Sequence, residues 1–266
     1  LLGACTNTSS SASDDGDAAT TQLSVAAFSV MEAANEPVFT DFQGSDAGKG
    51  VTFQTSYGAS GDQSRAVEGG LDADLVHFSL EPDITRLVDA GAILLDGRSP
   101  EEFARGHLIG SVNVGLEGRY AEFAGSVVPS DVDIVLVADP GFEIEARNRL
   151  GRIGFDRVVG YVADPLAVMA EHPDRTARAS RLTVPEFERR RVEISGLQLV
   201  DIRNPGEVAI GSIAGSVAMP VGQLPGRLDE LDLDAPTVVY CAGGYRSSVA
   251  ASVLRRAGFS DVSDLV

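Results

Sequence analysis

The feature that most constrains the fold of this chain is an internal repeat. The segment LLDGRSPEEFARGHLIGSVNV, from Leu94, aligns with LVDIRNPGEVAIGSIAGSVAM, which starts 105 residues later at Leu199. Identical positions include Asp96 and Asp201, Arg98 and Arg203, Pro100 and Pro205, Glu102 and Glu207, Gly106 and Gly211, and Gly110-Ser111-Val112 and Gly215-Ser216-Val217. A constant offset over this length indicates two copies of one structural unit.

Each copy alternates elements in the order strand, charged turn, strand, helix, strand, turn, helix, strand. The later segments RLGRIGFDRVVGY and VLRRAGFSDVSDL match at nearly the same offset. Strands that alternate with helices favour a parallel-sheet α/β domain. We therefore predict a first copy over residues 93–178 and a second over residues 179–266, linked by DPLAVMAEHPDRTARAS. We expect the second copy to be clipped at Val266, where a final turn and helix would follow.

A different α/β segment precedes the repeat, over residues 22–92. Its pattern predicts strands at 23–28, 49–58 and 73–80, an amphipathic helix over 30–42, and helices over 60–70 and 81–91. The strand-to-helix turn TSYGASGDQSRAV places Ser56, Ser60 and Gly61 where hydroxyls and backbone N–H groups can hold an oxyanion. The alternative is that Ser60 is an ordinary helix N-cap. This turn resembles that of the periplasmic sulfate- and thiosulfate-binding proteins of ABC importers, which implies a partial lobe of that fold.

The first 21 residues read as a leader and tether. LLGAC resembles a bacterial lipobox, in which Cys5 is lipidated, and the Ser/Thr/Asp/Ala-rich run behind it has too little apolar content to fold. No initiator Met or signal segment precedes the motif, so we expect a chain cut at its N-terminus. A lipidated Cys5 would tether the protein to a membrane in the cell envelope, and an unused motif would leave it cytoplasmic.

The repeat itself carries a more specific resemblance. Asp-x-Arg-x-x-x-Glu, then Gly-His-x-x-Gly-Ser, then an apolar strand that ends in a Cys loop, resembles the rhodanese pattern. The pair is similar to the tandem rhodanese modules appended to some metallo-β-lactamase-fold hydrolases of sulfur metabolism. The first copy has VLVADPGFEIEAR where the second has VVYCAGGYRSSVA, so it lacks the cysteine and is expected to be catalytically silent. The resemblance implies a sulfurtransferase that needs no metal or organic cofactor.

The loop YCAGGYRSS is the candidate active site. TVVY predicts a strand that delivers Cys241 to its carboxyl end, and SSVAASVLRRAG predicts a helix that begins at Ser247-Ser248. The helix N-terminus and Arg246 favour the thiolate form of the cysteine. The resemblance implies that Cys241 takes a sulfane sulfur from a small donor such as thiosulfate and passes it to a thiol or to cyanide. The residues predicted to form the substrate-binding loop are Ala242, Gly243, Gly244, Tyr245 and Ser247, with Arg246 beside Cys241 as catalytic and Asp201 and Arg203 as a supporting ion pair.

Other interpretations remain open from the sequence. Cys241 can be a small buried residue at a strand end, although this leaves the following Gly-Gly and Arg unexplained. A phosphatase of the Cys-x5-Arg kind uses a similar loop, but Cys241 and Arg246 are separated by four residues, which suits a single sulfur better than a phosphoryl group. A non-enzymatic sulfate-binding or sulfur-sensing lipoprotein with a rhodanese scaffold is the alternative from another class.

Composition excludes two kinds of site. The formal net charge is −18 and Lys49 is the only lysine, so binding to nucleic acid is disfavoured because like charges repel. Three histidines, at 77, 107 and 172, with no His-x-His-x-Asp motif, argue against a zinc site. The expected partners are therefore a small sulfur donor and a thiol acceptor.

Overall fold

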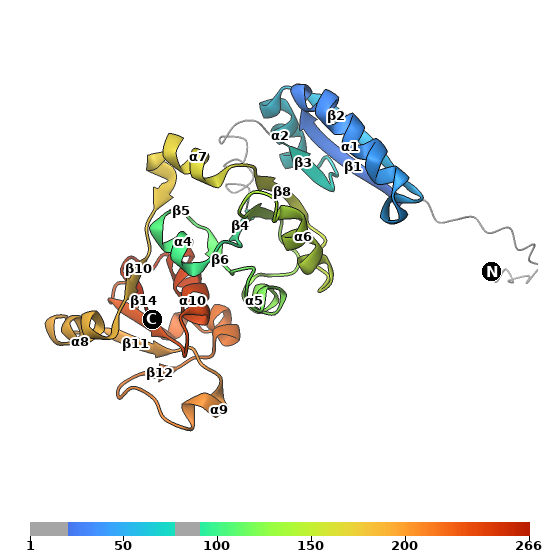
Figure 1. The fold of residues 1–266 in the computed structure, drawn as a ribbon. Coiled ribbons are helices and arrows are strands. Elements are labelled where there is room, and N and C mark those ends of the chain that lie inside the picture. The colour runs from blue at the N-terminus through green and yellow to red at the C-terminus, as the bar shows by residue number, and fades with distance from the viewer. Residues whose placement is uncertain (1–20, 78–90) are drawn as a thin grey trace, which may run out of the picture.

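The computed structural model describes residues 21–77 and 91–266 as a chain of parallel α/β units (Figure 1). The lipidation predicted at Cys5, nearly all of the tether and nearly all of the helix predicted over 81–91 lie outside the described residues. Within the described ranges, no helix is long and apolar enough to cross a membrane.

The N-terminal segment is a small parallel sheet with two helices. Its strands are β1 (Thr21–Phe28), β2 (Val51–Gly58) and β3 (Leu75–His77), arranged in the order β2-β1-β3. The helices are α1 (Glu32–Gly44), preceded by the 3-10 turn η1 (Ser29–Met31), and α2 (Ser60–Glu68), and a second 3-10 turn, η2 (Asp46–Gly48), precedes β2. The central strand forms because Val25, Ala26 and Ala27 are buried between its neighbours.

Helix α1 departs from the amphipathic helix predicted from its sequence. The helix forms, but its only buried residue is Asn35, while Val38 is 61% exposed. Phe39 packs instead against Phe53 of β2, with ring centroids 4.0 Å apart. The apolar positions of this helix are thus only partly covered by the described residues.

The first copy of the repeat contains a four-stranded parallel sheet in the order β6-β4-β7-β8. The central strands are buried on both faces, because alternate side chains of an α/β sheet enter the layers above and below it. Leu95 belongs to the core on one face, and Leu94 to the core on the other. The elements in chain order are β4 (Ile93–Asp96), α4 (Pro100–Arg105), β5 (His107–Leu108), β6 (Val112–Asn113), α5 (Tyr120–Val127), β7 (Ile134–Val137), α6 (Glu143–Gly151) and β8 (Val158–Val162).

A short connection joins the two copies. It comprises α7 (Pro165–Glu171), the 3-10 turn η3 (Pro173–Arg175) and β9 (Thr176–Ala177), which pairs antiparallel with β5.

The second copy has a five-stranded parallel sheet in the order β10-β14-β13-β11-β12. Its elements in chain order are β10 (Ser180–Leu182), α8 (Val184–Glu193), β11 (Gln198–Asp201), α9 (Pro205–Val208), β12 (Val217–Ala218), η4 (Val221–Gly226), η5 (Leu228–Glu230), β13 (Thr237–Tyr240), α10 (Tyr245–Arg256) and β14 (Val262–Leu265).

The charged turn predicted after the first strand of each copy is a short helix. In α4 the N-cap Ser99 accepts from the Glu102 N–H, while the Glu102 carboxylate accepts from Ser99. Asn204 and Glu207 form the same capping box at α9. The proline at the first helical position in both copies suits this geometry, because its missing N–H would have no partner within the helix.

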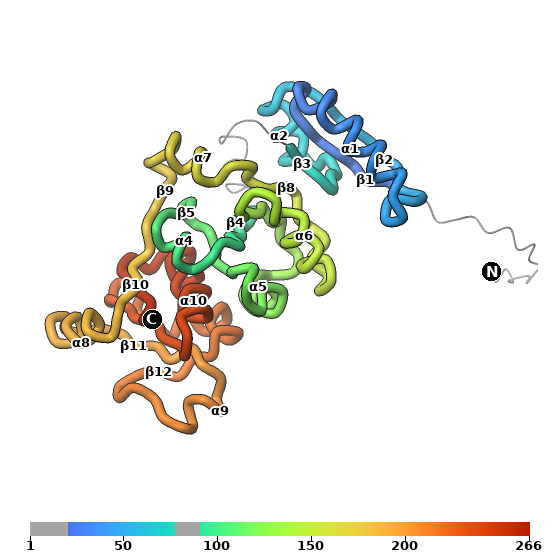
Figure 2. The backbone as a smooth tube through the Cα atoms, in the orientation of Figure 1, coloured from blue at the N-terminus to red at the C-terminus, as the bar shows by residue number. Residues whose placement is uncertain are grey.

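The N-terminal segment packs on the first copy through β3. Figure 2 shows β3 beside β8, the edge strand of the first sheet. Val76 of β3 fills the space above Gly160 of β8, where a Cβ atom would overlap its side chain. By the repeat offset β3 corresponds to β10, which occupies the matching edge of the second sheet.

The two copies share one hydrophobic core. Helix α10 packs against β6 of the first copy, and α5 packs against η4 of the second. Buried hydrogen bonds cross the same boundary: Ser248 donates to the Asn113 side chain, at 2.6 Å, and the Asn113 N–H donates to Ser252, at 2.9 Å. The helix that follows the cysteine loop is therefore anchored on the copy that lacks a cysteine.

Candidate active site

Cys241 lies immediately after the buried strand β13, at the carboxyl end of the second sheet. It is a half-buried free thiol, and the Gly244 N–H donates to its Sγ at 3.1 Å. Gly244 has φ +79°, a left-handed conformation that favours glycine. Of the backbone N–H groups in the described loop, Gly244 alone donates to the sulfur.

Helix α10 begins two residues earlier than predicted, at Tyr245 rather than Ser247. Because Gly244 already occupies the N-cap position, Arg246 lies within the first turn of the helix. Ser247 is fully buried, and its Oγ is 3.6 Å from Cys241 Sγ. The cysteine thus faces the N-terminal turn of a twelve-residue helix, whose positive end favours an anion there.

Arg246 is held by a residue that the sequence analysis did not single out as functional. Its Nη1 and Nη2 atoms donate to the two carboxylate oxygens of Glu207, at 2.6 and 2.8 Å. These bonds lower the pKa of Glu207 to about 2 and raise the pKa of Arg246, which Cys241 also raises. The motif offered a signal, since Glu207 is a conserved position of the repeat whose partner arginine occurs only in the copy with the cysteine.

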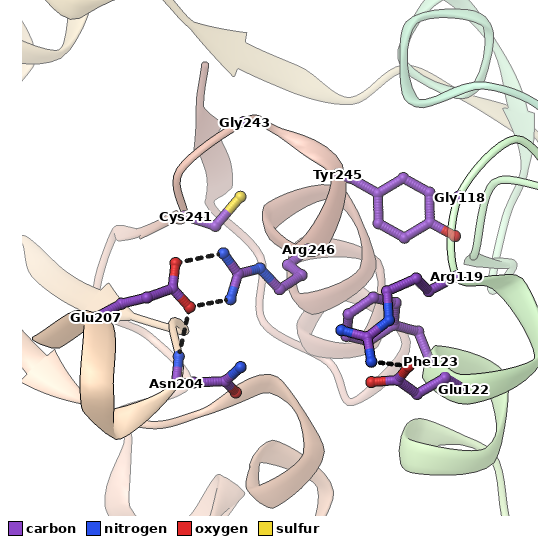
Figure 3. A pocket seen from close by; sticks show the side chains of 10 residues that line it. All are labelled: Gly118, Arg119, Glu122, Phe123, Asn204, Glu207, Cys241, Gly243, Tyr245 and Arg246. Atoms are coloured by element: carbon purple, nitrogen blue, oxygen red, sulfur yellow. Dashed lines mark hydrogen bonds and ion pairs between the residues drawn. The ribbon is translucent and has the colours of Figure 1, made fainter.

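Cys241 opens into a cleft of about 520 Å³ between the two copies (Figure 3). One side comes from the second copy and includes Glu207 and Arg246. The other side comes from helix α5 and the residues just before it in the first copy. The lining residues are Gly118, Arg119, Glu122, Phe123, Asn204, Glu207, Cys241, Gly243, Tyr245 and Arg246. Sequence reasoning missed the contribution of the first copy, because it depends on how the two copies pack.

Tyr245 connects the cysteine loop to the first copy. Its hydroxyl donates to the Gly115 carbonyl at 2.5 Å, and its ring lies 5.6 Å from the ring of Phe123. Gly118 leaves room for this ring, since a Cβ atom at that position would lie 2.5 Å from Tyr245 Cζ. Tyr245 therefore both lines the cleft and fixes the loop to the neighbouring domain.

Asp201 and Arg203 form a charged pair beside the loop and do not line the cleft. Arg203 Nη2 donates to Asp201 at 2.6 Å, and Tyr240 donates to the same carboxylate at 2.7 Å. Arg203 also donates to the Gly211 carbonyl. The pair thus ties the ends of three segments together, whereas, within the described residues, Asp96 and Arg98 of the first copy make the matching bonds only to each other and to the Gly106 carbonyl.

The corresponding turn of the first copy is chemically different. Ala138, fully buried, follows β7 where Cys241 follows β13. The next residue, Asp139, has acidic neighbours, and burial together with Glu102 raises its pKa. His107, a residue of the first copy only, is buried against Phe103, with its Nδ1 3.0 Å from the Phe103 carbonyl.

The predicted oxyanion turn connects strand β2 to helix α2, as expected from the sequence. Ser56 donates to the side chain of Gln63 at 3.1 Å. Helix α2 begins at Ser60 with Ala59 as its N-cap, so the alternative interpretation of Ser60 as the N-cap is wrong. Ser60 is buried, with Gly61 next to it in the first turn.

No group of three or more metal-ligating side chains occurs among residues 21–77 and 91–266. His77 is half-buried on β3, and this burial lowers its pKa.

The two copies of the repeat each match a known protein family. The family model described as a rhodanese-like domain matches residues 82–163 and matches again at residues 183–266. The chain belongs to the rhodanese-like family. The rhodanese-like domains therefore make up most of the chain, and the mixed α/β fold with parallel sheets is the one expected from the repeat.

Relatives match in separate parts of the chain. Thiosulfate sulfurtransferase GlpE of Pseudomonas aeruginosa is 41% identical over 76 residues, which cover 29% of this chain and 69% of that protein. A sulfate-binding protein of Synechocystis is 38% identical over 96 residues, which cover 34% of this chain and 27% of that protein. Among solved structures, the sulfate-binding protein SubI of Mycobacterium tuberculosis is 51% identical, with a TM-score of 0.26, over 27% of this chain and 25% of that one. The chain thus spans about a quarter of the length of these sulfate-binding relatives.

Proposed function

We propose that the second rhodanese-like domain is a sulfurtransferase that carries a sulfane sulfur as a persulfide on Cys241. The observation that carries this proposal is the position of Cys241 Sγ. It is a free thiol at the edge of the cleft, it accepts a hydrogen bond from the Gly244 N–H, and it faces the first turn of α10. A thiolate in such surroundings is a strong nucleophile.

The reaction has two steps that balance without a redox partner. In the first, the Cys241 thiolate attacks the outer sulfur of a donor such as thiosulfate, the S–S bond to Cys241 forms, and sulfite leaves with the electron pair of the broken bond. In the second, an acceptor thiolate attacks the outer sulfur of the persulfide, and Cys241 leaves as the thiolate. The name of the GlpE relative supports thiosulfate as the donor to test first.

The cleft suits small anionic and thiol-bearing compounds. The Gly244 N–H and the helix N-terminus favour negative charge next to the sulfur, and Arg246 lies at the same side of the cleft. Arg246 is already paired with Glu207, so its charge is partly neutralised, and its main contribution is a fixed position beside the loop.

The experiment is intact mass spectrometry after incubation with thiosulfate. The persulfide adds one sulfur, about 32 Da, as expected for a covalent intermediate. Cys241→Ser is the matched variant, because it replaces the thiol with a hydroxyl of similar size. A gain in the wild type that Cys241→Ser lacks supports the proposal. A folded wild-type protein that gains no sulfur from thiosulfate or from other sulfane donors contradicts it.

A further inference from the structure

A buried hydrogen-bonded chain leads from Cys241 to residues that do not line the cleft. The Cys241 thiol donates to Ser247 Oγ at 3.6 Å, and that hydroxyl donates to Asp264 Oδ2 at 3.2 Å. Ser247 is 0% exposed and Asp264 is 1% exposed. The mechanism above uses neither the serine hydroxyl nor this carboxylate. A buried carboxylate so close to a nucleophile calls for a chemical explanation, since burying a charge is costly.

Asp264 is held as a hydrogen-bond acceptor by Arg181 of the neighbouring strand β10. Arg181 Nε donates to Asp264 Oδ2 at 3.1 Å, and its Nη2 donates to the Gly244 carbonyl at 2.9 Å. The third nitrogen, Nη1, reaches Glu101 of the first domain at 2.5 Å. Two donors therefore converge on one oxygen of Asp264, an arrangement that suits an ionised carboxylate.

Charged groups from several elements face this chain. Burial raises the pKa of Asp264, and Arg181 from β10, the Ser247 hydroxyl and Arg255 from α10 offset only part of this rise. Arg246 faces Cys241 and is itself paired with Glu207 of α9. Between the two acidic groups, Asp264 and the Cys241 thiolate, stands one hydroxyl, that of Ser247, which has a single proton to donate.

The sulfur-transfer steps change the charge on Cys241 Sγ, so the need for a hydrogen-bond donor at this atom changes during the reaction. Sγ is a thiolate before sulfur is loaded and again after it is released. While the persulfide is present, Sγ is an uncharged disulfide-like sulfur and the negative charge lies on the outer sulfur. A hydrogen bond to Sγ is therefore needed only in the sulfur-free state.

We propose that the Ser247 hydroxyl is a two-position donor, which turns to Cys241 Sγ when that atom is a thiolate and to Asp264 when it is uncharged. Asp264 is then a positioning residue that acts on the cysteine through Ser247, and Arg181 holds Asp264 in place. The hydroxyl rotates and no proton leaves it, so the balance of the two transfer steps is unchanged. This inference deepens the proposed function and rests on it.

The test measures the thiol directly, without any sulfur donor. The rate of alkylation of Cys241 by iodoacetamide is followed against pH in a Cys5→Ser background, which leaves one cysteine. Ser247→Ala removes the donor to the thiolate and should move the pH midpoint of alkylation up by about one unit, a tenfold loss of thiolate at a given pH. Asp264→Asn releases the hydroxyl for Sγ and should move the midpoint down by a similar amount.

The double variant separates the two-position donor from a simple charge effect. If Asp264 acts through the serine, most of the shift caused by Asp264→Asn disappears in the Ser247→Ala background. An equal shift in both backgrounds, or no shift in Ser247→Ala, overturns the inference. Ser263→Ala is the matched control, because Ser263 is a buried serine next to Asp264 on β14 that donates to Ser180 and not to Cys241. The alkylation midpoint of Cys241 should stay unchanged in this variant.

Folding and sulfur loading are checked on the same variants. If Asp264→Asn does not fold, as seen by circular dichroism, the midpoint of Ser247→Ala alone decides the result. Mass spectrometry after thiosulfate then separates the two proposals. If the wild type gains sulfur but the alkylation midpoints of the variants do not shift, only the two-position donor is refuted. If the midpoints shift but no protein gains sulfur, only the sulfurtransferase is refuted.

Discussion

A single methyl group in the domain without a cysteine should impair the domain that has one. Gly118 of the first domain lies against the ring of Tyr245, and a Cβ atom there would approach Tyr245 Cζ to 2.5 Å and Cδ2 to 3.0 Å. Carbon atoms do not approach this closely, so the ring must move in Gly118→Ala. The ring is the end of a side chain, but its hydroxyl is bonded to Gly115 and its face packs near Phe123.

The loss of stability can be worked out from the contacts that the Tyr245 ring loses. Overpacking a filled site costs about 1–3 kcal/mol, and loss of the bond to Gly115 about 1 kcal/mol. We expect Gly118→Ala to lower the free energy of unfolding by about 2 kcal/mol and Tm by roughly 4–8 °C. Tyr245 follows Gly244, whose N–H contacts Sγ. A displacement of this loop should slow sulfur loading on the order of tenfold, because reacting groups tolerate little misplacement.

The assay is the rate of sulfur gain by mass spectrometry, alongside thermal unfolding. Gly151→Ala is the matched control, since Gly151 ends helix α6 of the same domain and a Cβ atom there meets nothing within 4 Å. It should leave loading unchanged and Tm equal or slightly higher. Tyr245→Leu should largely remove the effect of Gly118→Ala. Equal loading rates and Tm values for Gly118→Ala and Gly151→Ala would refute the role assigned to this interface.

Three further predictions concern the pH dependence of stability, the ion pair beside the loop and the copy without a cysteine. Burial lowers the pKa of His107 to about 4, so between pH 6.5 and 4 the unfolded chain binds a proton that the folded protein does not. The free energy of unfolding, measured by urea titration, should therefore fall by about 3 kcal/mol as the pH drops through this range, and His107→Phe should remove this dependence. Glu207→Gln should slow sulfur loading several-fold, because Arg246 loses its fixed position, while the free energy of unfolding changes by less than about 1 kcal/mol, since the pair is only partly buried. An unchanged rate of sulfur loading contradicts the positioning role. Ala138→Cys in the Cys241→Ser background should gain no sulfur, because Asp139 stands at the position of Ala242 and Glu143 at the position of Arg246. A gain of about 32 Da would disprove this explanation.

Much of the fold and the centre of the site could be predicted from local sequence. The repeat implies two similar domains, and the family match at residues 82–163 and 183–266 confirms two rhodanese-like units. The apolar run TVVY delivers Cys241 to a strand end, and the glycines after it allow the left-handed turn at Gly244. These predictions succeed because strands, turns and caps depend on residues that are neighbours in sequence.

The predictions from local sequence were wrong at some helix boundaries, where neighbouring residues compete for the N-cap position. They placed the start of α10 at Ser247, but the helix begins at Tyr245, because Gly244 takes the N-cap position. They placed a charged turn after the first strand of each copy, where the capping boxes of Ser99 and Asn204 start short helices. Both differences are shifts of a few residues at element ends, where hydrogen bonds to side chains decide the boundary.

The sequence by itself determined the repeated α/β architecture and which copy carries the nucleophile, because both depend on composition and spacing along the chain. Only the tertiary structure decided what surrounds that nucleophile. Arg119 and Phe123 enter the cleft from the other domain, and Asp264 reaches Ser247 from a strand 17 residues away. The first contacts arise from the packing of the two copies around a common core, and the second from the packing of α10 on β14 within one copy. Hydrogen-bond partners and cleft walls are properties of that packing, which residue order does not encode locally.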